Sequence, residues 1–257
     1  MKTTMLMVVG VTTLFSLAAC VSAGSQAEGE ITGKVWVLDR LNGAAPVPNT
    51  IITAEFTEDG QVGGSAGCNS YSGPYTVSGS SIEFKQPMAS TMMACEEPVM
   101  EQETAYFQVL AAAKSFAVKG DQLTLNDAGG KALATYKAQS QSLDGTSWQV
   151  ISYNNGNQAV TSVLAGTELT AIFGTDGNLS GSSGCNTYVG SYKVDGYKIT
   201  IGPLASTKKF CIDPAGVMDQ ESQFLAALQS AAAYKMEGNR LELRTQDGAL
   251  AADLQRK

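Results

Sequence analysis

Cysteine is the residue type in this chain with the most chemistry open to it. A thiol can form a disulfide, bind a metal, act as a nucleophile or carry a lipid. Of the five cysteines, Cys20 stands alone near the N-terminus, and the other four form two pairs with similar spacing. These pairs are Cys68 with Cys95, and Cys185 with Cys211.

The paired cysteines have two interpretations. Neither pair has the C-x-x-C spacing of many metal and redox sites, and a metal bound by all four would require the two halves of the chain to meet at their cysteines. Disulfides are typical of exported proteins, so we predict one disulfide within each half, Cys68–Cys95 and Cys185–Cys211. A shared metal site or a redox pair is the alternative.

Histidine is absent from the chain, and the formal net charge is −7 with a pI near 4.7. The missing imidazole excludes Ser-His-Asp and Cys-His catalysis and every His-ligated metal site. The sequence also has no basic stripe with interleaved aromatic residues that could neutralise phosphates, so we expect no nucleic-acid partner. We predict no catalytic residue, no metal and no cofactor.

The first residues have the features of an export signal. The positive start, Met1-Lys2, precedes an apolar stretch, Met5 to Ala19, that is too short to span a membrane. The sequence Leu17-Ala18-Ala19-Cys20 resembles the lipobox of bacterial lipoproteins, in which the cysteine receives a diacylglycerol before cleavage. We predict a lipoprotein signal peptide over residues 1–19 and lipidation of Cys20. An ordinary signal peptide with an unmodified cysteine is the alternative.

A lipidated Cys20 would place the protein in the cell envelope. Two or three acyl chains, such as palmitate, anchor a protein to a membrane that it does not span. The small, polar residues 20–32 are expected to form a tether. Val21, rather than Asp, follows the cysteine, and in a Gram-negative cell this favours the outer membrane, facing the periplasm or the surface.

The rest of the chain contains an internal repeat. The motif G-S-x-G-C-N-x-Y occurs at Gly64–Tyr71 and again at Gly181–Tyr188. Each copy follows a tryptophan and precedes, in the same order, Ala-Ser-Thr, a cysteine and Met-Glu/Asp-Gln-Glu. Two repeats of about 100 residues indicate a pair of self-sufficient domains rather than a solenoid. We predict these domains over residues 33–139 and 145–254.

The local pattern is the same in both repeats. Short runs rich in β-branched and aromatic residues alternate with Gly, Asn, Asp and Ser turns, and this predicts strands. One helix interrupts the strands in each copy, over residues 99–114 and 217–231. Asp195-Gly196 predicts a hairpin with a type I′ turn. The fold class is therefore α+β, mainly β, with two tandem small domains.

The repeated marks together resemble the META domain family, also described as HslJ-like. The resemblance covers nearly all of residues 33–138 and 145–254, and the first copy's Thr91–Cys95 matches the usual pattern more closely than Thr207–Cys211. It implies an antiparallel sheet or open barrel with one packed helix in each copy. It also implies an exported or envelope protein linked to stress, such as heat shock, and to drug tolerance. It implies no reaction.

The repeated motif is a candidate binding loop, formed by Gly67, Asn69 and Tyr71 in the first copy and by Gly184, Asn186 and Tyr188 in the second. The alternative is structural: glycine permits a tight turn, asparagine adopts a left-handed conformation beside it, and the cysteine staples the loop.

Three functions remain for comparison with the structure. The first is a non-catalytic envelope module that binds an envelope protein or a small apolar ligand. The second is an inhibitor or interaction scaffold for an envelope protease, with the disulfide-pinned loop as the recognition element. The third is a hydrolase that uses carboxylates near the first helix start, although acidic residues there also complement the helix dipole. These carboxylates are Glu96, Glu97, Glu101 and Glu103.

Overall fold

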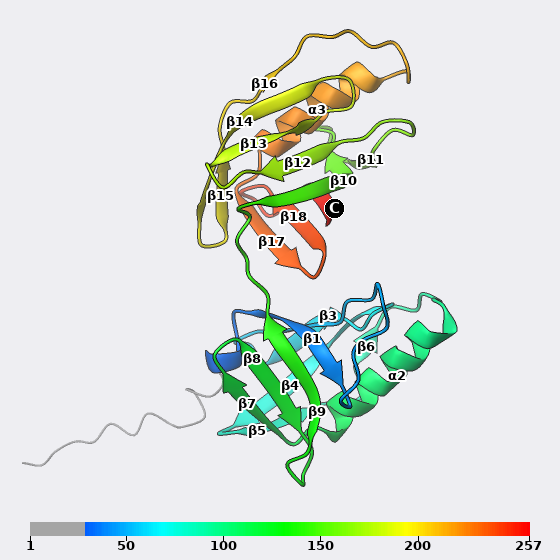
Figure 1. Ribbon diagram of the computed structural model, residues 1–257, viewed down its shortest axis with the longest axis vertical. Helices are drawn as coiled ribbons and strands as arrows, with labels where there is room; N and C mark the ends of the chain where they lie inside the picture. The colour runs from blue at the N-terminus through cyan, green and yellow to red at the C-terminus, as the bar shows by residue number, and fades with distance from the viewer. Residues whose placement is uncertain (1–28) are drawn as a thin grey trace, which may run out of the picture.

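The computed structural model describes residues 29–257, which form two domains joined by one short linker (Figure 1). The predicted signal peptide 1–19, Cys20 and most of the predicted tether 20–32 lie outside the described residues. In the described part of the chain, no helix is long and apolar enough to cross a membrane.

The first domain is an antiparallel sheet that curls into a barrel. Its barrel strands follow the order β3-β2-β1-β9-β8-β7-β5-β4, and β3 also pairs with β4, which closes the barrel. A short extra strand, β6, pairs with β4. The strands are β1 (Val35–Leu41), β2 (Thr53–Phe56), β3 (Gln61–Ser65), β4 (Ser70–Ser78), β5 (Ser81–Phe84), β6 (Ala89–Ser90), β7 (Ser115–Lys119), β8 (Gln122–Asn126) and β9 (Ala132–Ala138).

The second domain repeats this barrel strand for strand. Its order is β10-β12-β13-β14-β15-β17-β18-β19, closed by pairing of β10 with β19. Two short strands lie outside the barrel: β11 pairs with β10, and β16 pairs with β14. The strands are β10 (Thr146–Asn154), β11 (Val160–Ser162), β12 (Thr170–Phe173), β13 (Asn178–Ser182), β14 (Thr187–Asp195), β15 (Lys198–Ile201), β16 (Ala205–Ser206), β17 (Ala233–Glu237), β18 (Arg240–Arg244) and β19 (Leu250–Arg256).

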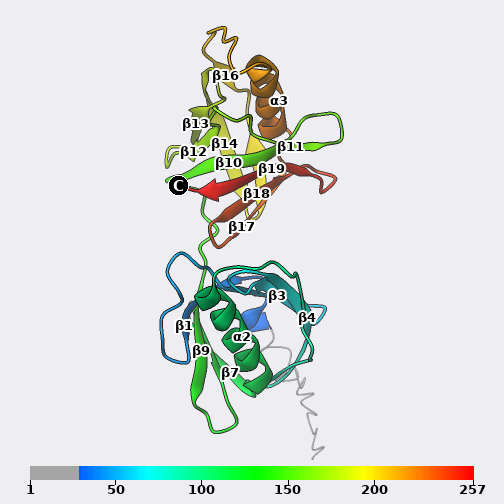
Figure 2. The same ribbon diagram turned by 90° about the vertical axis from the view of Figure 1, so that its right-hand side faces the viewer.

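One helix packs against each barrel (Figure 2). The first, α2 (Glu97–Ala112), begins two residues before its predicted start and carries Pro98 in its first turn, where no backbone N–H is needed. The second, α3 (Val217–Gln229), begins where the sequence predicts. The predicted fold class, mainly antiparallel β with one helix in each of two domains, is therefore confirmed, and each sheet closes into a barrel.

Side chains fill the interior of both barrels. The strand patterns alternate between buried and exposed residues, as in β4, because successive side chains of a strand point to opposite faces. Trp36 and Trp148 occupy equivalent, fully buried positions in the two cores. In the first domain, Phe56, Tyr106 and Tyr136 are also fully buried.

The hairpin predicted at Asp195-Gly196 forms, but its turn is shifted by one residue. Asp195 pairs with Lys198, so the two loop residues are Gly196 and Tyr197. Only Gly196 has a positive φ, 60°, which fits a type II′ turn and not the predicted type I′ turn. Glycine is needed at the first loop position because other residues rarely adopt that conformation.

Two glutamine side chains of the linker bind the backbone at the C-terminal end of β17. The side-chain amide of Gln139 accepts from Gly238 N at 2.8 Å and donates to Gly238 O at 2.7 Å. Gln141 makes the same two bonds with the backbone of Met236, both at 3.0 Å. Lys235 also forms an ion pair with Glu55 of the first domain. The contact between the domains is therefore mostly polar.

Candidate functional site

The repeated motif of the first domain is organised by the buried side chain of Asn69. Its amide nitrogen donates to Met93 O at 3.2 Å and to Glu103 Oε1 at 2.9 Å. Its amide oxygen accepts from Thr91 Oγ1 at 2.8 Å and from Met93 N at 2.7 Å. Asn69 therefore holds residues 91–97, which run from the end of β6 to the first residue of α2, against the motif. We call this segment pinned loop 1.

The carboxylate of Glu103 supports this arrangement from α2. Besides the amide of Asn69, it accepts from the backbone N–H of Asn69 at 2.8 Å. Both carboxylate oxygens are thus used, and Glu103 is buried. A buried carboxylate needs such donors because removal from water is costly.

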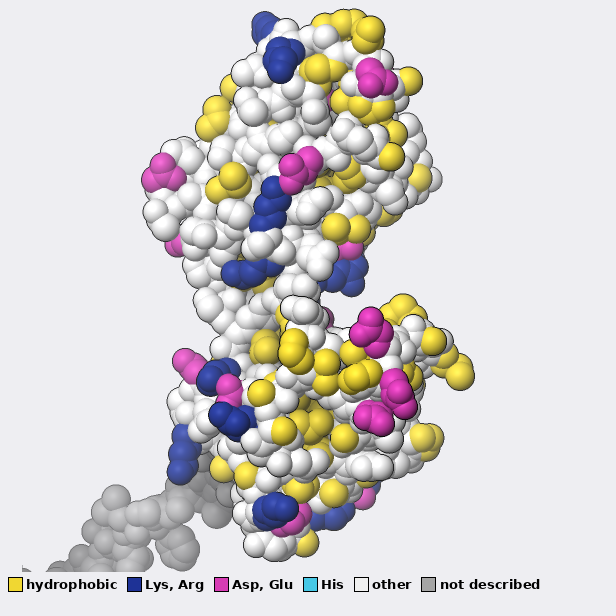
Figure 3. Space-filling model, turned by 45° about the vertical axis from the view of Figure 1, so that its right-hand side comes forward, with side chains coloured by type: hydrophobic (Ala, Val, Ile, Leu, Met, Phe, Trp, Pro, Cys, Tyr) yellow, Lys and Arg dark blue, Asp and Glu magenta, His cyan; other side chains and the backbone are white. Residues whose placement is uncertain are grey.

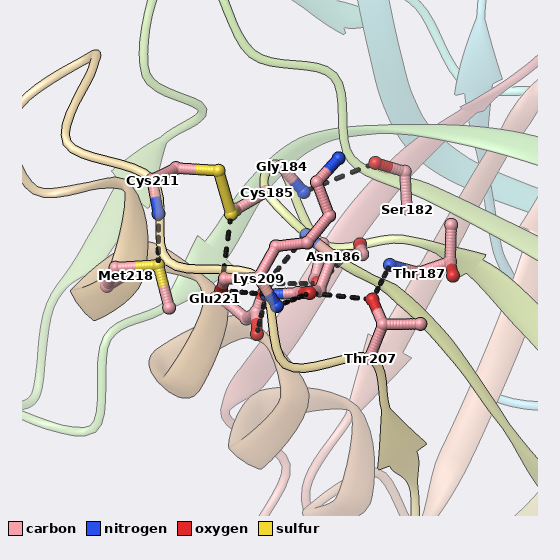
Figure 4. The surroundings of a disulfide bond; sticks show 11 residues. Ser182, Gly184, Cys185, Asn186, Thr187, Thr207, Lys209, Cys211, Met218 and Glu221 are labelled. Atoms are coloured by element: carbon pink, nitrogen blue, oxygen red, sulfur yellow. Dashed lines mark hydrogen bonds between the residues drawn. A yellow bond between two sulfur atoms is a disulfide. The ribbon is translucent and has the colours of Figure 1, made fainter.

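The second domain contains the same constellation, with one addition (Figure 4). Asn186 accepts from Thr207 Oγ1 at 2.6 Å and from Lys209 N at 2.8 Å, and donates to Lys209 O and Glu221 Oε1 at 3.0 and 3.1 Å. Glu221 also accepts from Asn186 N at 3.0 Å and from Ser183 Oγ at 2.7 Å. Residues 207–213 form the equivalent segment, pinned loop 2.

A disulfide closes each constellation. Cys68 and Cys95 are joined with a Cα–Cα distance of 6.0 Å, and Cys185 and Cys211 with a distance of 5.9 Å. The two predicted pairings are therefore confirmed. Within residues 29–257, no group of three or more His, Cys, Asp or Glu side chains is placed to hold a metal ion.

The helix also fixes a second loop in each domain through a buried glutamine. Gln102 accepts from Val47 N at 2.6 Å and donates to Thr50 Oγ1 at 2.9 Å. Gln220 makes the equivalent bonds with Leu164 N at 2.7 Å and Thr167 Oγ1 at 3.0 Å. The same glutamine amides lie close to the glycines of the two motifs: a Cβ at Gly67 or Gly184 would meet the amide nitrogen at 3.2 or 2.9 Å.

The tyrosine of the motif belongs to the core. The hydroxyl of Tyr71 donates to Thr53 O at 3.0 Å and lies 2.8 Å from that of Tyr106, which accepts from Tyr136 at 3.3 Å. Burial raises the pKa of all three phenols well above the usual 10.0, and charge repulsion from a neighbouring phenol is a smaller cause in the same direction. In the second domain Tyr188 keeps the bond to Thr170 O, at 2.8 Å, and burial raises its pKa as well.

Comparison with known protein families identifies the family of this chain. A family model described as META domain matches residues 29–140 and again residues 141–257. This chain belongs to the META domain family. The resemblance inferred from the repeated marks is thereby confirmed, and the matched spans contain both predicted domain ranges.

Solved structures similar to part of this META-domain chain include a protein from Burkholderia xenovorans. It is 29% identical, with a TM-score of 0.37, over 45% of this chain and 83% of its own. A DUF4847 family protein from Bacteroides vulgatus is 18% identical, with a TM-score of 0.33, over 43% of this chain and 92% of its own. The comparison with curated proteins gave no match.

Each META domain uses the predicted binding-loop residues within the fold. The side chains of Asn69, Tyr71, Asn186 and Tyr188 are buried and hydrogen-bonded to their own domain. Gly67 and Gly184 adopt positive φ values of 108° and 105°, whereas neither asparagine does. The expectation of a left-handed asparagine was therefore wrong: the asparagine acts through its side-chain amide.

The surface that each META domain offers is the pinned loop itself. In pinned loop 1, Met92 is 98% exposed and Met93 is 58% exposed, beside exposed Glu96 and Glu97. In pinned loop 2, Phe210 and Ile212 are each 81% exposed, beside exposed Lys208 and Lys209. Large apolar side chains on a fixed backbone can contact a partner with little loss of chain entropy.

The glutamate and glutamine of the two helices were missed as parts of the site. The sequence suggests for Glu103 only a helix-dipole role or a catalytic role, and it suggests no role for Gln102. The available signal was the Gln-Glu pair shared by both copies, Gln102-Glu103 and Gln220-Glu221, next to the buried helix positions Tyr106 and Phe224. A polar pair on a buried helix face predicts hydrogen-bond partners in another element.

Proposed function

We propose that this chain is a non-catalytic, lipid-anchored module of the bacterial cell envelope that binds an envelope partner through pinned loop 1. The observation that carries the proposal is the exposure of Met92 and Met93 on a backbone held by Asn69 and a disulfide. Methionine side chains adapt to varied apolar partners, and such patches are typical of binding surfaces.

The filled barrels favour a surface partner over a ligand inside the barrel. The centre of the first barrel holds Trp36, Phe56, Tyr106 and Tyr136, all fully buried. A small apolar ligand would have to displace these side chains, at the cost of their packing. A protein segment that covers the two methionines requires no such change.

The carboxylates near α2 give little support to the hydrolase alternative. Glu103 is occupied by the donors of Asn69, while Glu96, Glu97 and Glu101 are exposed. A catalytic acid lies next to a substrate cavity and partly out of water, whereas these three glutamates are exposed. Removal of the three exposed carboxylates is therefore expected to leave any hydrolytic background unchanged.

The envelope location belongs to the same proposal. It is supported by the lipobox-like sequence that ends at Cys20, and by the family resemblance to envelope proteins linked to stress and drug tolerance. In a Gram-negative cell Val21 favours the outer membrane. The anchor would concentrate pinned loop 1 near its partner, so that a small contact area would suffice.

The proposal is tested by cross-linking in the native envelope. A photo-crosslinking amino acid at position 93 is expected to capture a discrete partner, and one at exposed Lys131 is not. Met92→Ser/Met93→Ser should abolish capture, and Cys68→Ser/Cys95→Ser should weaken it, because the loop is then less ordered. Capture of a protease that the protein inhibits would assign the protease-inhibitor alternative. Equal products from positions 93 and 131 would refute the proposal.

A further inference from the structure

Pinned loop 2 has diverged from pinned loop 1 and lies at the end of the second domain remote from the first. The segment from β16 to α3 forms this end in both ribbon views (Figures 1 and 2). Figure 3 shows basic and apolar side chains together on the same end of the molecule. The loop displays Phe210 and Ile212, each 81% exposed, on either side of Cys211.

The backbone of this loop is fixed on both sides of its exposed residues. Asn186 binds both the N–H and the C=O of Lys209, at 2.8 and 3.0 Å. Cys211 is bound by the disulfide to Cys185, and its N–H lies 3.5 Å from Met218 Sδ. The exposed side chains are therefore held outward and have no packing role in the domain.

The charge of pinned loop 2 is opposite to that of the rest of the molecule. Lys208 and Lys209 are exposed, and within residues 29–257 neither has an ion-pair partner. With Asp213 they give residues 207–213 a net charge of +1, in a chain of net charge −7. The equivalent residues 91–97 carry two glutamates and no lysine.

We propose that pinned loop 2 docks onto an anionic lipid surface. Phe210 and Ile212 would enter the interface between headgroups and acyl chains, and Lys208 and Lys209 would meet the lipid phosphates. Aromatic and aliphatic side chains beside lysines are the combination that interfacial segments use on anionic membranes. The inference does not depend on lipidation of Cys20 or on a partner for pinned loop 1.

The shape of the loop favours a bilayer over a protein partner. Its contact side chains project from a terminal loop, and a stable protein interface takes about 800 Å² from each partner, or roughly 20–30 residues. Four side chains on a projecting tip supply a small part of that. A bilayer deforms around a tip and needs no complementary cavity.

The test measures vesicle binding by a chain of residues 21–257, which lacks a lipid anchor and retains every described contact. Vesicles of phosphatidylcholine alone and vesicles with phosphatidylglycerol added are compared by co-sedimentation. Binding is expected only with the anionic lipid, and it should weaken as salt screens the lysines. Lys208→Gln/Lys209→Gln should reduce the partition coefficient about 30-fold, which corresponds to about 1 kcal/mol per lysine.

Two further variants separate charge from apolar contact. Phe210→Ser/Ile212→Ser should also lose binding, because the lysines alone do not hold the loop at the interface. Lys193→Gln/Lys198→Gln, which removes the same charge from the exposed β14–β15 hairpin, should retain binding. All variants should show the wild-type circular dichroism spectrum and both disulfides.

Three outcomes would overturn the inference. The first is no binding to anionic vesicles, and the second is equal binding by the wild type and the Lys208→Gln/Lys209→Gln variant. The third is self-association in light scattering that Phe210→Ser/Ile212→Ser abolishes without vesicle binding, which would assign the surface to a second copy of the chain. The cross-linking test at position 93 reads a different loop, so its failure and this one are distinguishable.

Discussion

In each domain a buried glutamate satisfies the hydrogen-bond donors of a buried asparagine. Glu103 accepts from both the backbone and the side chain of Asn69, and Glu221 does the same for Asn186. Buried donors that lose an acceptor cost about 1–3 kcal/mol each. The pair therefore stabilises the domain and also places the pinned loop.

We expect Glu103→Ala to lower the free energy of unfolding of the first domain by about 2–4 kcal/mol, because two buried donors of Asn69 lose their acceptor. Denaturant unfolding measures the effect. Glu101→Ala, on the exposed face of the same helix, is the matched control and should change stability by less than about 0.5 kcal/mol. Equal effects of the two substitutions would contradict the role of Glu103.

The buried tyrosines predict a loss of stability at alkaline pH. Burial raises the pKa of Tyr71, Tyr106 and Tyr136 in the folded domain, so the folded state keeps protons that the unfolded state releases above pH 10. The stabilising effect is complete below pH 10 and is lost as the pH rises beyond it, by up to about 1.4 kcal/mol per pH unit for each tyrosine. Urea unfolding at pH 8 and pH 11 checks this, and an unchanged midpoint would refute it.

At the scale of elements, the disulfide and the asparagine fix the same loop by different means. The disulfide joins cysteines 27 residues apart in the first domain and 26 in the second. Closing a loop of this size removes chain entropy mainly from the unfolded state. The hydrogen bonds of Asn69 act only in the folded state.

Cys68→Ser/Cys95→Ser is therefore expected to lower the free energy of unfolding of the first domain by about 3.5 kcal/mol. At low denaturant the loop should remain near its place, because Asn69 still binds both backbone groups of Met93. Denaturant unfolding and amide exchange at Met93 measure the two effects. No loss of stability in the variant, or exchange at Met93 as fast as in an unfolded chain, would show that the two restraints are not separate.

The sequence predicts the local elements better than their connections. The repeated marks locate both domains, both helices and both cysteine pairs, because these signals are local or occur twice. The turn at Gly196-Tyr197 was shifted by one residue, since strand register decides which residues form the loop. The pairing of β1 with β9 and the bond from Glu103 to Asn69 join elements that are far apart in the sequence and that no local pattern relates.

At the scale of the whole molecule, the two glutamines of the linker hold the domains together. Gln139 and Gln141 each bind both backbone groups of one residue at the C-terminal end of β17, whereas the ion pair of Lys235 with Glu55 is partly exposed. Exposed ion pairs contribute about 0–1 kcal/mol, so the glutamines are the larger restraint. The relative position of pinned loops 1 and 2 depends on them.

Gln139→Ala/Gln141→Ala is expected to increase motion between the domains and to leave the unfolding of each domain within about 1 kcal/mol of the wild type. Small-angle X-ray scattering should show a broader distribution of interatomic distances for the variant. Lys235→Gln is the control and should change the distribution less. An unchanged scattering profile for the glutamine variant would show that other contacts hold the domains.

The most direct test of the whole account is the intact mass of the protein isolated from its native membrane, measured with thiol alkylation before and after reduction. We expect a chain that begins at an acylated Cys20, with no alkylated thiol before reduction and four after it. An unacylated chain would contradict the envelope anchor, and four free thiols before reduction would contradict the two pinned loops.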